Sequence, residues 1–592
     1  MTTPQIILFV LLFFVFVFLV WGRWRYDLVA FVALLVGLLA GVIPMDQAFS
    51  GFGHPATIII ALVLVISRGL SNSGVIELLG RYVVDPARKL GAHITVMSAL
   101  AASLSAVMNN VAALALLMPV DLQAAKKAGR AASFTLMPLS FASILGGMIT
   151  LIGTPPNIVV SEFRNDALGE PYSMFSFAPV GLACAAVGVA YVALLGWRLL
   201  PAKTTAAGKS EQERFDLADY VTEVRVPEGS PVIGKKVRDL DEEAAKGDVV
   251  FVGLSRRGRR FPGLARNTEI KADDILVVES SPDSLDEALG IFGLEYIGKG
   301  EGIFEDGDLT MAEVVVPESS RLAGRSVMSV RLLYRYRVAL VGVARMGTRF
   351  RDGVRKLVLK PGDVLLLLGA PDSIQDAIGR LGLLPLADRG QRVVQRNKIR
   401  IAVGTFTVAI LVASFGLVYL PIALGCVAAA YVALNIVPIR DVYQSIEWPV
   451  IVLLGSMIPI GSALQSTGST ALIADGIVAL AGGLSPAWVL ALLVVVTMSL
   501  SDVMNNTATA VIAAPVAIDI SGSLGVNPDP FLMGVAVAAS CAFLTPIGHK
   551  NNTLIMGPGG YRFGDYWRMG LPLELLIVVV SVPMILWVWP LH

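Results

Sequence analysis

The chain has 592 residues, and its 47 Lys and Arg balance 46 Asp and Glu to a net charge of +1. Of these charged residues, 62 lie between 201 and 400, which leaves 31 for the other 392 positions. A soluble protein cannot cover its surface with so few charges, so both flanks are predicted to lie in a lipid bilayer. The near-zero net charge excludes a nucleic-acid-binding protein, which needs a basic excess. The three Cys stand at irregular spacing in apolar runs, which disfavours a disulfide scaffold or a zinc site.

Ten apolar runs of spanning length are predicted to cross the membrane as helices. The first, 6–21, has no basic segment before it and no small-residue cleavage site after it, so we interpret it as a retained helix rather than a signal peptide. The other runs are 27–44, 55–72, 132–152, 174–198, 401–418, 420–437, 448–464, 529–546 and 571–589.

Two further apolar segments, 92–121 and 484–520, are predicted to be re-entrant hairpins. Basic residues enrich cytoplasmic loops, and they flank 92–121 on both sides. No Lys or Arg occurs from Asp441 to His549, so 484–520 is expected to enter from the outside. This topology leaves the central domain in the cytoplasm and both termini outside the inner membrane. The alternative is that each hairpin is one long helix or a pair of ordinary short helices.

The two membrane halves, 1–200 and 398–592, repeat each other at nearly constant offset. Five spans per half is an odd number, so the second half is inverted relative to the first, an architecture of secondary transporters. The matches are Pro55 with Pro449 and Gly74 with Gly468 at 394, Met108-Asn109-Asn110 with Met504-Asn505-Asn506 at 396, and Thr154-Pro155 with Thr545-Pro546 at 391.

The charged middle contains a second duplication, over 205–300 and 301–390. Val-Pro-Glu at 226–228 recurs at 316–318, and short β-branched runs alternate with turns in both copies. Each copy is predicted to be a small α+β domain. No Gly-x-Gly-x-x-Gly opens either copy, so a dinucleotide-binding fold has no support. The Arg cluster at 256–260 indicates either a site for a phosphate-bearing ligand or a solvated hairpin tip.

Four segments are predicted to be unwound inside the membrane, two at the hairpin tips and two at Gly- and Pro-rich breaks. Their free carbonyl, Asn, Ser and Thr oxygens suit Na+, and the adjoining helix N-termini suit an anion. The predicted anion-binding residues are Asn109, Asn110, Thr154, Pro155, Asn157, Asn505, Asn506, Thr507, Thr545 and Pro546. The predicted Na+ ligands are Ser105, Asn110, Gly147, Thr150, Gly153, Ser501, Asp502, Asn506 and Ser540.

Each of these assignments has an alternative. A buried Asn pair also serves helix–helix hydrogen bonding. Asp502, whose repeat partner is Ala106, is expected either to bind a cation or a proton or to lie in water at the outer mouth. His549 and Lys550 follow the second break, and the simpler interpretation has Lys550 snorkelling to the cytoplasm.

Over both membrane halves, about two thirds of the chain, these motifs resemble the divalent anion/sodium symporter family. In that family each hairpin tip carries Ser-Asn-Thr, the tips and Thr-Pro breaks bind Na+ and an anion, and transport uses an elevator movement. The matching positions are Asn109-Asn110-Val111 and Asn505-Asn506-Thr507. Asn replaces Ser at both tips and Val111 replaces the first Thr, which puts a dicarboxylate substrate in doubt.

The segments 545–548 and 557–565 look more like the sulfate-transporter-like branch of that family. The two middle units resemble TrkA-C domains, the ligand-binding domains of potassium-conductance regulators. This resemblance implies a cytosolic module that dimerises the protein and senses a small anion or nucleotide.

The sequence therefore predicts a Na+-coupled importer of a small divalent anion, with sulfate first and C4-dicarboxylates or sulfonates as alternatives. No catalytic residue is predicted, so the chain is not expected to be an enzyme. Two other classes stay open: a cation channel or potassium-uptake protein, which lacks a filter-like sequence, and a Na+/H+ antiporter, which rests on Asp502. An ATP-driven pump lacks a Gly-x-x-x-x-Gly-Lys-Ser/Thr loop.

Overall fold

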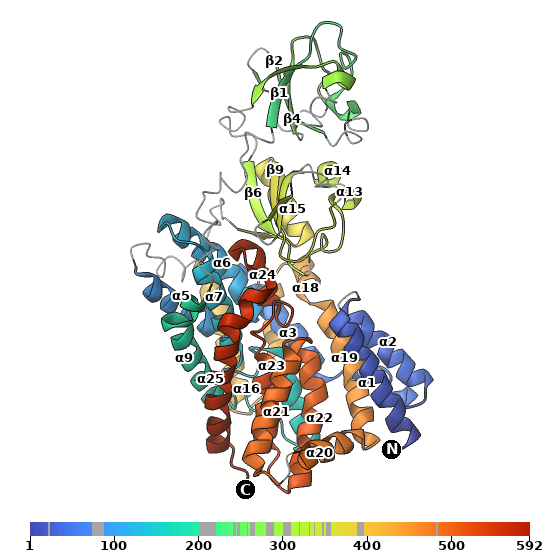
Figure 1. Ribbon diagram of the computed structural model, residues 1–592, viewed down its shortest axis with the longest axis vertical. Coiled ribbons are helices and arrows are strands. Elements are labelled where there is room, and N and C mark those ends of the chain that lie inside the picture. Colours follow the sequence, from blue (N-terminus) through green and yellow to red (C-terminus); the bar gives the residue numbers. More distant parts are fainter. Residues whose placement is uncertain are drawn as a thin grey trace.

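The computed structural model shows a bundle of helices with two small sheets stacked at one end and both termini at the opposite end (Figure 1). It describes residues 1–21, 24–73, 88–200, 221–240, 244, 249–256, 259–260, 267–279, 289–299, 310–318, 320–330, 332–336, 338–345, 348–350, 357–386, 396–480 and 483–592. The expected match at Gly74, positions 257–258 of the Arg cluster and the expected domain boundaries near 205, 300 and 390 lie outside these ranges.

The first half contains eight described α-helices, and two of them, α3 and α8, begin with Pro, a residue suited to the first helical turn. They are α1 (Thr3–Trp21), α2 (Tyr26–Leu39), α3 (Pro55–Asn72), α5 (Leu90–Ser105), α6 (Asn110–Lys127), α7 (Ser133–Gly147), α8 (Pro155–Leu168) and α9 (Ala178–Leu194). The short 3-10 turns η1 (Met45–Gln47) and η2 (Ser50–Phe52) precede α3, and η3 (Gly196–Leu199) follows α9.

The second half repeats this order among its described residues. Its helices are α16 (Arg396–Ser414), α17 (Leu420–Ala433), α18 (Ile439–Ser445), α19 (Trp448–Ser466), α20 (Ser469–Leu480), α21 (Pro486–Ser501), α22 (Asn506–Leu524), α23 (Asp529–Ser540), α24 (Lys550–Gly559) and α25 (Tyr566–Val588). The 3-10 turn η7 (Phe563–Asp565) leads into α25.

Helix packing shows the same duplication. In the first half α5 packs on α7 and α9, and in the second half α21 packs on α23 and α25. Helices of the two halves also pack on one another. Helix α2 packs on α19 and α3 on α17, while α7 packs on α24 and α8 on α23. Each half therefore completes the core of the other.

The two expected hairpins appear as pairs of helices that meet at an Asn-containing break. Helices α5 and α6 are separated by residues 106–109 and pack on each other, as do α21 and α22 around residues 502–505. The expected breaks in 132–152 and 529–546 are also present, because α7 ends at Gly147 and α23 at Ser540. After each break the chain resumes as a separate helix, α8 or α24, which the spanning pattern did not resolve.

Four helical segments among the described residues are long and apolar enough to cross a membrane, namely Met45–Asn72, Trp448–Ser466, Asn506–Leu524 and Phe563–Val588. Ten shorter apolar helices of 10–17 residues accompany them. The sidedness of the hairpins and the count of ten spanning helices remain predictions.

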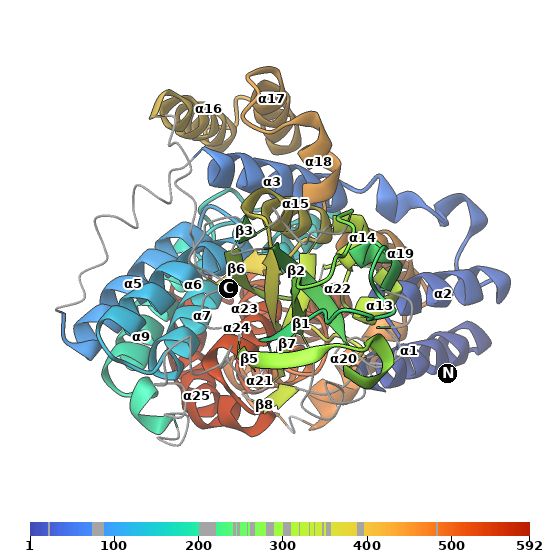
Figure 2. The same cartoon turned by 90° about the horizontal axis from the view of Figure 1, so that it is seen from above.

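The inserted region forms two five-stranded antiparallel sheets. The first comprises β1 (Val221–Arg225), β2 (Val250–Arg256), β3 (Arg259–Arg260), β4 (Ile275–Glu279) and β5 (Glu295–Lys299) in the order β3-β2-β4-β1-β5. The second comprises β6 (Thr310–Val315), β7 (Val338–Arg345), β8 (Thr348–Phe350), β9 (Val364–Gly369) and β10 (Leu384–Pro385) in the order β10-β6-β9-β7-β8. Read from its other end, the second order is β8-β7-β9-β6-β10. It equals the first order when β6 to β10 replace β1 to β5, which confirms the duplication. Figure 2 looks along the long axis and shows both sheets over the middle of the helices.

An Arg–Asp pair recurs in both sheets. Arg256 donates from Nε and Nη2 to the two carboxylate oxygens of Asp274 over 2.6 and 2.7 Å, and Arg345 binds Asp363 in the same way over 2.7 Å. The Asp carboxylates are buried, so each holds its guanidinium by charge-assisted bonds, and this hydrogen bonding raises the pKa of Arg345. Arg256 therefore serves the sheet, which favours the structural interpretation of the Arg cluster at 256–260.

Candidate functional site

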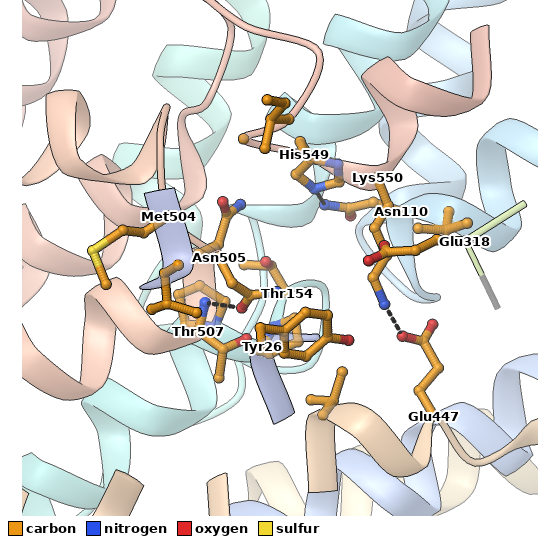
Figure 3. A pocket seen from close by; sticks show the side chains of 18 of the residues that line it. Tyr26, Asn110, Thr154, Glu318, Glu447, Met504, Asn505, Thr507, His549 and Lys550 are labelled. Carbon is orange, nitrogen blue, oxygen red and sulfur yellow. Dashed lines mark hydrogen bonds and ion pairs between the residues drawn. The ribbon is translucent and has the colours of Figure 1, made fainter. Parts of the chain in front are cut away.

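The two hairpin tips and the two breaks meet around one cavity of about 330 Å³ (Figure 3). Four helix N-termini reach it: those of α6 and α8 from the first half and those of α22 and α24 from the second. The lining residues from these segments are Asn109, Asn110, Val111, Gly153, Thr154, Pro155, Pro156, Val503, Met504, Asn505, Asn506, Thr507, Ile547, Gly548, His549 and Lys550. Converging N-termini carry partial positive charge and free N–H groups, so the cavity suits an anion.

Polar side chains shape three of these four N-termini. Asn109 accepts a hydrogen bond from the N–H of Val111 over 2.8 Å, and Asn505 accepts one from the N–H of Thr507 over 2.9 Å. At the N-terminus of α24, Nδ1 of His549 accepts a hydrogen bond from the N–H of Asn551 over 3.1 Å. These caps fix the breaks in place, since each satisfies a backbone N–H that the helix leaves free. The first Asn of each pair therefore positions its tip.

Asn110, the second Asn of the first pair, is the centre of a buried polar cluster. Its Oδ1 accepts from the hydroxyl of Ser105 over 2.5 Å, and its backbone carbonyl accepts from Ser143 over 2.9 Å and from Nδ2 of Asn551 over 3.2 Å. Gly147 of α7 lies directly against the Asn110 amide, with no room for a Cβ. The predicted ligands Ser105, Asn110 and Gly147 are thus brought together.

The second half builds an equivalent cluster around Asn506. The hydroxyl of Ser501 lies 3.0 Å from Oδ1 of Asn506 and donates to the carbonyl of Ala539 over 2.6 Å. Asp502, only 2% exposed, accepts from the N–H of Leu544 over 2.9 Å. The predicted ligand Ser540 is buried nearby, but its hydroxyl donates to the Ala536 carbonyl within α23.

Each cluster holds one buried oxygen without a hydrogen-bond partner among the described residues. In the cluster around Asn110 it is Oδ1 of Asn551, which α24 of the second half contributes. In the cluster around Asn506 it is Oδ2 of Asp502, whose neighbour is the carboxyl group of Glu574. An unpaired buried oxygen is costly unless a ligand binds it. A Na+ ion needs oxygen ligands of this kind, so the residues present fit a cation in both clusters.

The structure corrects the repeat match that paired Thr154 with Thr545. The hydroxyl of Thr545 donates to the carbonyl of Asp502 over 2.6 Å, and the residue that makes the same bond in the first half, to Ala106, is Thr150. The offset is therefore 395 rather than 391, and Thr154 corresponds to His549.

This register explains which predicted anion-binding residues line the cavity. Asn109, Asn110, Thr154, Pro155, Asn505, Asn506 and Thr507 do so. Thr545, Pro546 and Asn157 are not among its lining residues. Asn157 instead donates to the Thr150 carbonyl over 2.8 Å, and its repeat partner Asn552 donates to the Thr545 carbonyl over 3.1 Å. Asn157 and Asn552 therefore stabilise the two breaks through backbone carbonyls outside the cavity.

Several charged and aromatic residues of the cavity were not predicted. Lys550 forms an ion pair with Glu447, which precedes α19, and its ammonium lies 5.9 Å from the ring centroid of Tyr26. Figure 3 shows Lys550 directed into the cavity, with Glu318 beside it. The Lys550 ammonium therefore lies at the cavity, and its position relative to the membrane surface stays a prediction. The pattern Thr-x-x-Gly-x-x-x-Asn, present at 150–157 and 545–552, would have placed residues 549 and 550 at the start of a helix.

A second buried carboxylate, Glu574 of α25, also went unpredicted. It accepts from the N–H of Phe543 over 3.2 Å, and Asp502 accepts from the N–H of the next residue, Leu544. The two carboxyl groups therefore lie side by side behind the second break. An isolated Glu in the last apolar span gave no spacing signal in the sequence.

A protein-family model described as citrate transporter, CitMHS, matches residues 16–525 and 485–591. The chain belongs to this transporter family. An uncharacterised transporter of Synechocystis is 30% identical over 98% of this chain and 95% of its own length. Sodium/sulfate cotransporter 2 of Chlamydomonas reinhardtii is 20% identical over 93% of this chain and 86% of its own. The crystal structure of the Alcanivorax borkumensis YdaH transporter has 14% identity and a TM-score of 0.42, with 94% of this chain and 90% of that chain covered.

Family membership confirms that the protein is a multi-pass membrane transporter and not an enzyme. The match spans both membrane halves, where the sequence motifs had indicated a carrier related to anion/sodium symporters. The assignment to the sulfate-transporter-like branch and the TrkA-C resemblance of the inserted sheets remain proposals.

Proposed function

We propose that this transporter is a Na+-coupled symporter of a small divalent anion, and that its preferred substrate is sulfate. The observation that carries the proposal is the convergence of four helix N-termini, two from each half, on a cavity that also contains Lys550. Backbone N–H groups and one ammonium suit a compact anion with oxygen atoms on all sides. The sodium/sulfate cotransporters among the relatives support the same coupling ion and substrate.

Two cation sites flank this anion site in the proposal. The first is built around Ser105, Asn110 and Asn551, and the second around Ser501, Asn506 and Asp502. Each has an unpaired buried oxygen, and each adjoins the N-terminal residue of a helix that lines the cavity. Since Asn110 and Asn506 belong to both kinds of site, binding of Na+ orders the tip that the anion contacts. Na+ and the anion would thus bind cooperatively, as symport requires.

The C4-dicarboxylate alternative is weaker because one hairpin tip lacks a side-chain hydroxyl. Val111 lies in the cavity at the position where the dicarboxylate-binding motif carries Thr, so the first tip offers no side-chain hydroxyl there. The second tip retains Thr507. A substrate with two separated carboxylates would meet a hydroxyl on one side only, whereas sulfate needs no such symmetry.

The test is uptake of radiolabelled sulfate by the full-length protein in proteoliposomes, with and without an inward Na+ gradient. We expect uptake that requires Na+ and that excess unlabelled sulfate suppresses more strongly than citrate, succinate or taurine. Uptake that is indifferent to Na+ would contradict the coupling. Stronger suppression by citrate or succinate would reassign the substrate to a carboxylate.

A further inference from the structure

The second inserted unit, residues 310–386, contributes a carboxylate to the transport cavity. Glu318 lies in the turn after β6 and lines the same cavity as the hairpin tips. Figure 3 shows it beside Lys550, whose ion pair is with Glu447. Lys550 thus faces two carboxylates, Glu447 from the membrane part and Glu318 from the insert.

The insert is held there by close packing on α24, the helix that begins with Lys550. A Cβ at Gly362, in the turn before β9, would lie 2.9 Å from the carbonyl oxygen of Thr553. A Cβ at Gly557 would collide with the carbonyl of Gly362. Two glycines therefore allow the backbones of the insert and of α24 to touch.

Apolar burial supports the same contact. Val315, Val364 and Leu386 of the second unit belong to the buried cluster formed by the membrane helices. Most of the other buried apolar residues of this unit form a core of their own, as do most of those of the first unit. The second unit is thus docked by an apolar interface, whereas its own fold does not depend on that interface.

We propose that the docked second unit is an autoinhibitory cap whose Glu318 competes with the anionic substrate for Lys550. The inference rests on the proposed function, because it requires that Lys550 binds the anion. A carboxylate is itself an oxyanion, so Glu318 offers Lys550 the same type of oxygen ligand as sulfate does. An anion binds Lys550 fully only when the cap withdraws, and a signal that undocks the unit would therefore activate transport.

The duplication supplies a matched control. Glu228 occupies in the first unit the position of Glu318 in the second, after the same Val-Pro pair. Both residues are exposed, but only Glu318 lines the cavity. We expect Glu318→Gln to lower the sulfate concentration for half-maximal uptake about 2- to 5-fold, as for the loss of one partly exposed charge contact. Glu228→Gln should leave it unchanged.

A second variant tests docking without touching the cavity. Asp273 is the repeat partner of Gly362 and has a positive φ of 62°, against 87° at Gly362. Asp is therefore compatible with this turn, but at position 362 its side chain would collide with α24. Gly362→Asp should lower the half-maximal sulfate concentration to a similar extent, and the double variant with Glu318→Gln should show no further gain.

The outcomes separate the two proposals. Absence of Na+-dependent sulfate uptake by the wild-type protein would refute the proposed function itself. Normal wild-type uptake, with Glu318→Gln indistinguishable from Glu228→Gln both in uptake and in sulfate-induced thermal stabilisation, would refute the cap. Additive effects of Glu318→Gln and Gly362→Asp would also overturn it, because Glu318 would then act independently of docking.

Discussion

In the proposed first cation site, Gly147 lies directly against the side chain of Asn110. A Cβ at Gly147 would lie 2.8 Å from Nδ2 of Asn110 and would collide with its Oδ1. Asn110 is 5% exposed and held by Ser105 and Ser143, so it has little room to retreat. Gly147→Ala therefore forces either the tip or α7 to shift.

The size of this effect follows from two terms. Overpacking of a tight core costs about 1–3 kcal/mol, and breaking the bond between Ser105 and Asn110 leaves buried polar atoms unpaired at about 1–3 kcal/mol. If about 1.4 kcal/mol of this cost falls on the Na+-bound state alone, the affinity for Na+ decreases tenfold. We expect Gly147→Ala to raise the Na+ concentration for half-maximal uptake roughly tenfold.

The assay is Na+-dependent uptake in proteoliposomes, paired with thermal unfolding in detergent over a Na+ titration. Gly522→Ala in α22 is the matched control, because a Cβ there meets no atom within 4 Å. The Gly147 variant should lose most of the Na+-induced stabilisation that the control retains. Equal Na+ dependence in the two variants would refute the placement of a cation next to Asn110.

Three other substitutions test the site, and a fourth tests the insert. Asn110→Ala and Asn506→Ala should each abolish uptake while the protein still elutes as a folded species; retained transport would mean that the tips only pack. Lys550→Gln should weaken sulfate binding about tenfold or more, as for loss of a charge-assisted bond, with little change in Na+ affinity. An unchanged sulfate KM would exclude Lys550 from the anion site. Asp363→Asn should destabilise the insert by about 1–3 kcal/mol because Arg345 loses its ionic partner, and hydrogen exchange confined to residues 310–386 would show it; unaltered exchange there would contradict the structural role of the pair.

The features that the sequence predicted correctly are those that require particular residue types at the position where they occur. A helix that starts in the middle of a membrane needs Asn, Ser, Thr, Gly or Pro at its first positions, so both tips and both breaks were visible as motifs. The duplicated insert was visible for a similar reason, since turns and buried strands recur at a fixed offset. Helix ends and repeats are local properties, and local composition encodes them.

The features that sequence did not reveal depend on partners far apart in the chain. The Thr-Pro dipeptides at 154 and 545 are alike in letters, and the spacing to Gly and Asn offers a competing match of Thr150 with Thr545. The bonds to Ala106 and Asp502 decide for Thr150. Lys550 could not be assigned to the cavity without knowing that Glu447 lies opposite it. The docking of the second unit depends on Gly362 meeting Gly557, a contact that no periodicity encodes.

The corrected register also shows where the two halves differ. Thr154 and Pro155 in the first half occupy the positions of His549 and Lys550 in the second, so both halves offer the anion a helix N-terminus but only the second offers an ammonium. The same half holds Asp502, whose partner is Ala106. One carboxylate 4 Å from a cation contributes about 4 kcal/mol at an effective dielectric constant of about 20, before the cost of its desolvation. In a symporter of the proposed type, the second cation site therefore fills at the lower Na+ concentration, and the neutral site around Asn110 sets the Na+ dependence of transport.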